Sequence, residues 1–300
     1  MINKIFALPV VEQLTPVLSR RQIDGADVIV VDHPRVKASV ALNGAHLLSW
    51  KPEGETEVLW LSDATSFKKG AAIRGGVPVC WPWFGPHPTD PTKPQHGFVR
   101  NRRWTVVSAN STSQVTELTL RTETTPEDAA LWPHHAEVSL RFIAGATLCL
   151  ELATRNTGSQ AFELTQALHS YFKVSDIANV AIEGFDGLEY LDKVDAYARK
   201  RQSGQITITG ETDRIYLGHT GPAIIHDSGL GRGIIVTKSG STSSVVWNPW
   251  EERARQMGDL GEDGYRRMVC VETANAGDDV VRIDPGHQHT LVANIQIARG

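Results

Sequence analysis

The chain has 300 residues, of which 41% are hydrophobic and 21% are charged, as in ordinary globular proteins. Its formal net charge of −4 excludes the basic surface that non-specific nucleic-acid binding needs, so we expect no nucleic-acid partner. No run approaches the roughly 18 to 20 apolar residues of a transmembrane helix, and the first residues lack an apolar stretch of signal-peptide length. Cys80, Cys149 and Cys270 are scattered in apolar runs, which is typical of a reducing compartment. We therefore expect a cytoplasmic protein with no membrane partner.

Hydrophobic residues alternate with polar ones along much of the chain. In 116–123, for example, the leucines share one face and the polar residues share the other, the pattern of a strand with one buried face. The same kind of reasoning predicts a series of short strands. They span 28–31, 36–42, 58–61, 116–123, 137–142, 148–154, 163–172, 213–217, 233–237, 243–247, 266–272 and 290–297.

Turn residues separate these strands, and helical patterns are scarce. One short helix is expected in 125–132, where Thr125 is a cap residue and Pro126 opens the helix, and a second is expected in 248–257. Many short strands between turns rich in Gly and Pro indicate an all-β fold, a large antiparallel sandwich or barrel. The sequence contains no linker, charge block or internal repeat, so we expect one domain over residues 1–300.

His169 is the first candidate for chemistry. On a strand it shares a face with Ala167 and Tyr171, opposite Leu168 and Phe172. A histidine placed in this way can be an acid–base group that points into a site, but a structural histidine with satisfied hydrogen bonds is the commoner case. The stretch alone leaves both interpretations open.

Glu272 is the second candidate, because it lies at the end of an apolar run. A buried carboxylate costs several kcal/mol unless it is paired or hydrogen-bonded. The alternative is an exposed glutamate at a strand end. A histidine and a glutamate that converge across a sheet would form an acid–base pair, but the sequence does not show that these two converge.

The most unusual segment is 72–85, with 95–100 close behind it. Two glycines follow Arg74 and permit close approach of the backbone to a ligand, and three aromatic residues within 81–84 offer flat surfaces for a sugar ring. Gln95 and His96 precede Arg100, and Arg74 and Arg100 together can clamp a phosphate. A packed aromatic loop with two surface arginines is the alternative.

Other motifs carry little weight. His134 and His135 are adjacent and point to different faces of a strand, and His287 and His289 lie beside a Pro-Gly turn, so we expect no metal site. The glycine-rich stretch 229–233 does not match a dinucleotide fingerprint, and no Gly-x-Ser-x-Gly elbow is present. We expect no cofactor.

Five segments, in order, resemble the signature segments of the aldose 1-epimerase superfamily, and most closely its hexose-6-phosphate mutarotase (glucose-6-phosphate 1-epimerase) branch. The resemblance runs from about Asp32 to the C-terminus. The segments are 73–85, 96–100, 167–172, 212–216 and 269–274.

The resemblance implies a galactose-mutarotase-like β-supersandwich and assigns roles to site residues. His169 and Glu272 match the catalytic histidine and glutamate, and Asp213 matches an aspartate that holds sugar hydroxyls. Arg74 and Arg100 match arginines that receive the 6-phosphate, with Gln95 and His96 beside them. The loop 86–94 does not look like a fixed family feature.

The implied reaction is anomer exchange of a hexose 6-phosphate without metal, nucleotide or covalent intermediate. Glu272 takes the proton of the anomeric hydroxyl while protonated His169 donates to the ring oxygen, and the opened ring recloses after rotation about C1–C2. Three alternatives stay open: an aldose 1-epimerase for free sugars, a non-catalytic sugar-phosphate-binding domain on the same fold, and metal-dependent chemistry in a β-barrel. The sequence leaves the oligomeric state open.

Overall fold

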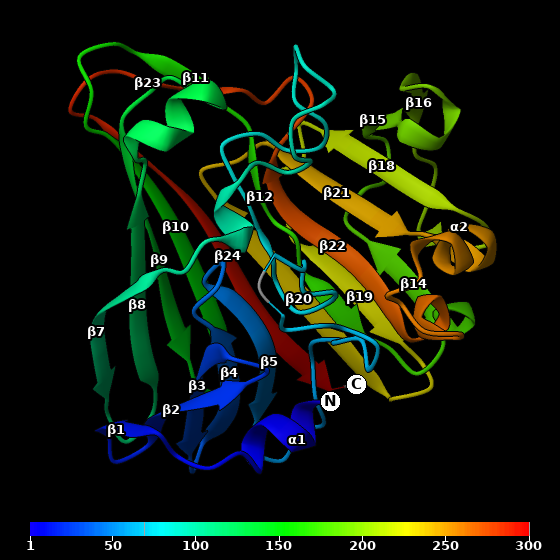
Figure 1. Ribbon diagram of the computed structural model, residues 1–300. Coiled ribbons are helices and arrows are strands. Elements are labelled where there is room, and N and C mark those ends of the chain that lie inside the picture. Colours follow the sequence, from blue (N-terminus) through cyan, green and yellow to red (C-terminus); the bar gives the residue numbers. More distant parts are fainter. Residues whose placement is uncertain (69, 300) are drawn as a thin grey trace.

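A nine-stranded antiparallel sheet forms the back of the molecule (Figure 1). The computed structural model describes residues 1–68 and 70–299. The last strand in chain order, β24, lies inside this sheet between β20 and β10. The spatial order is β17 (Ile206–Thr207), β14 (Val180–Glu183), β19 (Ala223–Asp227), β20 (Arg232–Ser239), β24 (Gln288–Arg299), β10 (Leu148–Asn156), β9 (Ala136–Ala144), β8 (Thr116–Glu123) and β7 (Thr105–Ser111).

An eight-stranded antiparallel sheet carries most of the residues that the sequence singles out. In this sheet β18 pairs with β21, and β21 pairs with β22. All eight residues of β22 are buried. A further strand, β13 (Tyr171–Lys173), also pairs with β22. The spatial order is β16 (Ala198–Arg201), β15 (Glu189–Asp192), β18 (Thr212–Leu217), β21 (Ser243–Asn248), β22 (Met268–Asn275), β12 (Gln166–Leu168) and β6 (Val79–Cys80).

Two smaller sheets complete the β structure. The five-stranded one is built from the N-terminal strands in chain order, and the two-stranded one pairs β11 (Phe162–Leu164) with β23 (Val281–Ile283). The N-terminal strands are β1 (Glu12–Thr15), β2 (Leu18–Ile23), β3 (Ala26–His33), β4 (Val36–Ala41) and β5 (His46–Pro52).

One hydrophobic cluster draws on all three large sheets. It includes Trp50 of the five-stranded sheet, Phe142 and Leu291 of the nine-stranded sheet, and Val271 of the eight-stranded sheet. In β9 buried and half-buried residues alternate without a break, as the period-two pattern predicts. The mostly β, antiparallel fold that the sequence predicts is confirmed.

Helices are short. The predicted helix in 248–257 is α2 (Trp250–Met257), which ends at Gly258 with a φ of +70°, and α1 (Ile2–Phe6) was not expected. The segment 125–132 instead contains the 3₁₀-helix η2 (Pro126–Ala130). A capping box between Thr125 and Asp128 stabilises its N-terminus. Within residues 1–68 and 70–299, every helix is too short or too polar to span a bilayer.

Three predicted strands differ in the structure. Residues 58–61 form only isolated bridges, Leu59 with Phe172 and Leu61 with Gly75, because their partners are loops and strand ends rather than one parallel or antiparallel neighbour. The stretch 163–172 is divided among β11, β12 and β13. The ladder is interrupted at His169, whose N–H donates to the Pro78 carbonyl at 3.0 Å. The segment 266–272 begins with the 3₁₀-helix η5 (Gly264–Arg267), so its strand starts at Met268.

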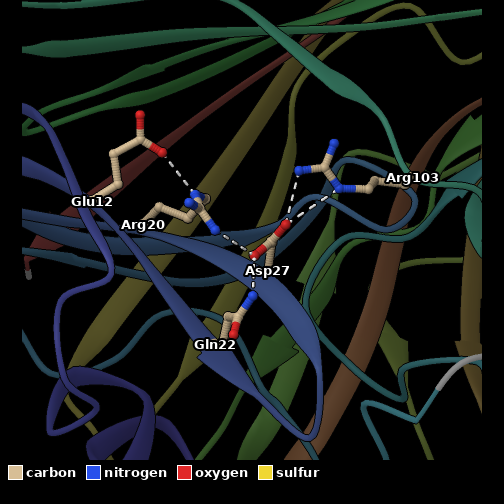
Figure 2. Close-up of polar contacts among 5 residues, drawn as sticks. All are labelled: Glu12, Arg20, Gln22, Asp27 and Arg103. Carbon is tan, nitrogen blue, oxygen red and sulfur yellow. Dashed lines mark hydrogen bonds and ion pairs between the residues drawn. The ribbon is translucent and has the colours of Figure 1, made fainter.

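Asp27 connects the five-stranded sheet to the segment before β7 (Figure 2). Its Oδ1 accepts from Arg20 Nη1 and from Gln22 Nε2, each at 3.0 Å, and its Oδ2 accepts from Arg103 Nη2 at 2.8 Å. Arg20 also donates to Glu12 at 2.9 Å. Burial acts to raise the pKa of Asp27, but donation from Arg103, Gln22 and Arg20 outweighs it and lowers that pKa below its ordinary value.

We expect Asp27→Asn to reduce the free energy of unfolding at pH 7 by about 1 to 3 kcal/mol, because hydrogen bonds to a charged acceptor are lost. A lowered folded-state pKa gives stability that is present above the unfolded pKa of 3.8 and is lost as pH falls through the folded pKa. Urea unfolding of both proteins should therefore show a constant difference from pH 7 to about pH 4 and a smaller one below. Asp32→Asn, at an exposed carboxylate paired with Lys37, is the control. A difference that does not change down to pH 3 would contradict this account.

Candidate active site

A cavity of about 500 Å³ is lined by residues of β18, β21, β22 and α2 and by the loops beside them. The structure brings all seven residues singled out from the sequence to this one cavity, although they come from five separate segments. They are Arg74, Gln95, His96, Arg100, His169, Asp213 and Glu272.

His169 and Glu272 meet because the strands around them pair. Leu168 lies opposite Thr273 and Tyr171 lies opposite Cys270, so the chain between β12 and β13 runs beside Glu272 on β22. Nδ1 of His169 is 3.4 Å from Oε1 of Glu272, within ion-pair distance, but the geometry makes no hydrogen bond. The pair is thus close enough to act on one small ligand.

Aromatic rings enclose His169. The Tyr171 ring stacks on it, with centroids 4.8 Å apart and planes inclined by 10°, and Trp247 and His96 meet it edge-on at 5.8 Å. Leu168 and Phe172 lie in the main hydrophobic cluster, as the alternation along this segment predicts. The packing fixes the plane of the imidazole.

Burial shifts both members of the pair toward their neutral forms. Glu272 is 1% exposed, and burial, with help from the Asp213 carboxylate, raises its pKa well above the ordinary range, while Lys193 opposes the shift. Burial, together with His96 and Arg74, lowers the pKa of His169 well below its ordinary value. Both pKa shifts therefore favour a protonated carboxyl and a neutral imidazole.

Arg74 is held on two sides. Its Nε and Nη2 each lie 3.0 Å from an oxygen of Asp259, in a two-pronged ion pair, and its Nη1 donates to the Tyr171 hydroxyl at 3.0 Å. These contacts occupy three of the five N–H groups of a guanidinium. One N–H on Nη1 and one on Nη2 remain for a ligand in the cavity.

Arg100, Gln95 and His96 line the cavity near Arg74. Arg100 belongs to the 3₁₀-helix η1 (Val99–Asn101), and its buried Nε has no hydrogen-bond partner among residues 1–68 and 70–299. Burial, with Arg100 next in effect, lowers the pKa of His96 to about 3, so His96 is neutral. Gln95 is exposed. An anion in this region would therefore meet two guanidinium groups. That of Arg74 is held in place by Asp259 and Tyr171, and that of Arg100 has a free Nε among the described residues.

Asp213 forms an ion pair that the sequence did not suggest. Nζ of Lys193, from the 3₁₀-helix η4 (Lys193–Asp195), lies 2.7 Å from Oδ2 of Asp213 and over the Phe84 ring, 5.6 Å from its centroid. Burial alone would lower the pKa of Lys193, but the Asp213 carboxylate raises it, so the ammonium stays charged. The pair places polar groups of both signs where sugar hydroxyls can bind.

The glycines of 72–85 and two of its aromatic residues contact the rest of the protein, although the sequence led us to expect contacts with a ligand. A Cβ on Gly75 would lie 2.4 Å from the Trp60 carbonyl oxygen, and one on Gly76 would lie 2.1 Å from that of Leu47. These glycines therefore permit close approach to neighbouring backbone, not to a ligand. Trp81 and Trp83 are buried in the main cluster, and of the three aromatic residues only Phe84 lines the cavity.

Several cavity residues were missed from the sequence. Tyr171 had a signal, since it shares a strand face with His169. Lys193 had none, because nothing in its local pattern distinguishes it from a surface lysine. The helix α2 was expected, but its position beside the cavity, where Arg253, Gln256 and Met257 contribute to the lining, depends on tertiary packing.

Known proteins resemble this chain over nearly its whole length. The family model described as Aldose 1-epimerase matches residues 27–296. Proteins named "Putative glucose-6-phosphate 1-epimerase" are 50% identical in Salmonella typhimurium, with 92% of both chains covered, and 47% identical in Escherichia coli, with 100% of both covered. The crystal structure of a "putative mutarotase" from Salmonella typhimurium superposes with a TM-score of 0.94 at 46% identity and covers all of both chains. The chain belongs to the aldose 1-epimerase family.

Proposed function

We propose that this protein is a hexose-6-phosphate mutarotase that interconverts the α and β anomers of glucose 6-phosphate. The observation that carries the proposal is one cavity that holds both an acid–base pair, His169 and Glu272, and two arginines, Arg74 and Arg100. The names of the Salmonella and Escherichia coli relatives support the same substrate.

The arginines suit the phosphate group. A phosphate monoester carries roughly −1.5 to −2 charges at neutral pH and offers three acceptor oxygens. Asp259 and Tyr171 fix the orientation of Arg74, and within residues 1–68 and 70–299 two of its N–H groups and the buried Nε of Arg100 have no partner. Binding the phosphate would supply that partner, because guanidinium N–H groups form charge-assisted hydrogen bonds with phosphate oxygens.

With the phosphate at the arginines, the sugar ring reaches His169 and Glu272. One of the pair removes the proton of the anomeric hydroxyl while the other protonates the ring oxygen, and the ring opens to the aldehyde. Rotation about C1–C2 exposes the other face of the aldehyde, and reclosure with the two roles exchanged gives the other anomer. Asp213 and Lys193 hold ring hydroxyls during the turnover.

The pair needs one shared proton, and its position decides which residue starts as the acid. The pKa directions favour the proton on Glu272, whereas family resemblance assigns the acid role to His169. Both forms contain the same number of protons and differ only by transfer between groups 3.4 Å apart. Because the two roles are exchanged on reclosure, either residue can act first as the acid.

The direct test is anomer exchange measured by NMR at equilibrium. Glucose 6-phosphate should exchange faster with the protein present, and His169→Ala should abolish the acceleration. Acceleration of free glucose or galactose only would favour a free-sugar aldose 1-epimerase. Binding of glucose 6-phosphate without acceleration would favour a non-catalytic sugar-phosphate-binding domain.

Tyr171→Phe should raise KM for glucose 6-phosphate about 3- to 10-fold with little change in kcat, the loss expected for one hydrogen bond. The variant loses the hydroxyl that holds Arg74 but keeps the ring that stacks on His169. Tyr216→Phe is the matched control, since it loses a buried hydroxyl bond to Gln202 outside the cavity. A large fall in kcat with unchanged KM would contradict this role of Tyr171.

We further propose that the chain acts as a single domain in the cytoplasm. The hydrophobic cluster shared by the three large sheets supports one cooperative unit. Cys80, Cys149 and Cys270 are all free thiols, which supports a reducing compartment.

A further inference from the structure

Three side chains that often bind zinc lie close together beside the cavity. A ring nitrogen of His169, Sγ of Cys270 and a carboxylate oxygen of Glu272 all lie within 4.8 Å of one another. Cys270 and Glu272 are two residues apart on β22, so their side chains project from the same face of the sheet. The fold thus places one nitrogen, one sulfur and one oxygen donor around a common point.

Two of these donors are buried without a partner. Oε2 of Glu272 and Nδ1 of His169 make no hydrogen bond within residues 1–68 and 70–299, and Glu272 is 1% exposed. A buried polar atom without a partner costs about 1 to 3 kcal/mol. An ion bound to the imidazole would give Nδ1 of His169 the partner that it lacks, which distinguishes the cluster from an ordinary group of nearby side chains.

The geometry suits a tetrahedral ion with bonds of about 2.0 to 2.2 Å to nitrogen and oxygen. Two such ligands at a tetrahedral angle lie about 3.4 Å apart, and Nδ1 of His169 and Oε1 of Glu272 are separated by 3.4 Å. Sγ of Cys270 lies within 4.8 Å of a ligand atom of each of these two residues and is the third ligand. His169 and Glu272 also line the cavity, so the fourth position is open to a water molecule.

The donor set selects among metals. Thiolate and imidazole ligands suit Zn²⁺, whereas Mg²⁺ and Ca²⁺ prefer oxygen ligands alone. Arg74 and Lys193 oppose a cation at this point and Asp213 favours it. The loss of protons from the Cys270 thiol and the Glu272 carboxyl balances the two positive charges of the ion.

We propose that His169, Cys270 and Glu272 bind one Zn²⁺ ion, which inhibits the enzyme by occupying its acid–base pair. The two protons released go to solvent, and no oxidant or reductant takes part. The binding claim stands on the cluster itself, whereas the inhibition claim rests on the proposed mutarotase function. The two claims therefore have separate readouts.

Calorimetric titration of the full chain with ZnCl₂, in the absence of sugar, tests the binding. The wild type should bind one ion, and Cys270→Ser should bind it at least tenfold more weakly. Cys149→Ser is the matched control, because Cys149 is the most accessible of the three thiols and lies on β10, in the other sheet. Co²⁺ should give a thiolate charge-transfer band in the wild type and in Cys149→Ser, but not in Cys270→Ser.

Inhibition is tested on the same proteins by NMR anomer exchange. Zn²⁺ should slow exchange of glucose 6-phosphate by the wild type, EDTA should restore it, and Mg²⁺ at the same concentration should have no effect. Each variant is compared with its own metal-free rate, and Cys270→Ala replaces Cys270→Ser if the latter does not fold. Absence of stoichiometric Zn²⁺ binding, or binding unchanged in a folded Cys270 variant, would overturn the site. If the wild type does not catalyse exchange at all, calorimetry and the cobalt spectrum still decide the binding claim.

Discussion

Replacement of Glu272 by Gln is expected to slow anomer exchange of glucose 6-phosphate by a factor of about 10² to 10⁴, the usual contribution of a positioned acid or base. The amide preserves the shape of the side chain but can neither give up nor regain a proton during the reaction. The fold should tolerate the change, because burial raises the pKa of the Glu272 carboxyl well above its ordinary range and so favours a neutral side chain. Loss of activity and loss of structure are therefore separable at this position.

The measurement is the NMR exchange rate at saturating substrate, with thermal unfolding recorded in parallel. Glu211→Gln provides the control, since it makes the same chemical change at an exposed residue of the cavity lining. We expect that control to retain its rate within a factor of about three. Exchange by Glu272→Gln within tenfold of the wild type would remove Glu272 from the acid–base role.

Arg100→Met should reduce kcat/KM for glucose 6-phosphate by about 10- to 150-fold, since charge-assisted hydrogen bonds contribute about 1.5 to 3 kcal/mol. Arg100 suits this test, because its Nε has no hydrogen-bond partner in the part of the chain that the structure describes. The substitution therefore leaves no former partner of Nε unsatisfied. The loss should appear mainly in KM, since the phosphate contacts are the same in both anomers and in the opened ring.

Free glucose serves as the internal control, because it lacks the group that Arg100 binds. Whatever rate the wild type has with free glucose should be unchanged in Arg100→Met. Arg100→Lys should be intermediate, since an ammonium keeps the charge but not the planar fork of donors. An equal loss with free and phosphorylated glucose would show that Arg100 supports the cavity rather than the phosphate.

Strands with one solvent-facing side were predictable from the sequence, and so was the buried strand β21, predicted as 243–247 and found as Ser243–Asn248. The alternation along β8 and β9 gives their positions almost to the residue, because water covers one side of each. By contrast, 58–61 is apolar but forms only isolated bridges, one to Phe172 of β13 and one to Gly75, because hydrophobicity does not record which partner a buried segment finds. The break at His169 likewise depends on the Pro78 carbonyl from a distant loop.

In the candidate site, too, local features could be predicted from the sequence, and contacts between distant segments could not. The face on which His169 lies follows from a period of two, and Tyr171 could have been added by the same rule. The approach of His169 to Glu272 depends on the pairing of β12 and β13 with β22, which no local pattern contains. Lys193 and Asp259 gain their roles only from ion pairs with Asp213 and Arg74, residues far away in the sequence.

The position of β24 has a consequence for biosynthesis. This strand is made after every other strand, yet it lies between β10 and β20 and joins the two parts of the nine-stranded sheet. Until residues 288–299 have left the ribosome, β10 and β20 each present an unpaired edge, the kind of surface on which chains aggregate. The nascent chain therefore passes through a late stage at which both parts of this sheet have been made but cannot yet be joined, and protection of those edges matters most at that stage.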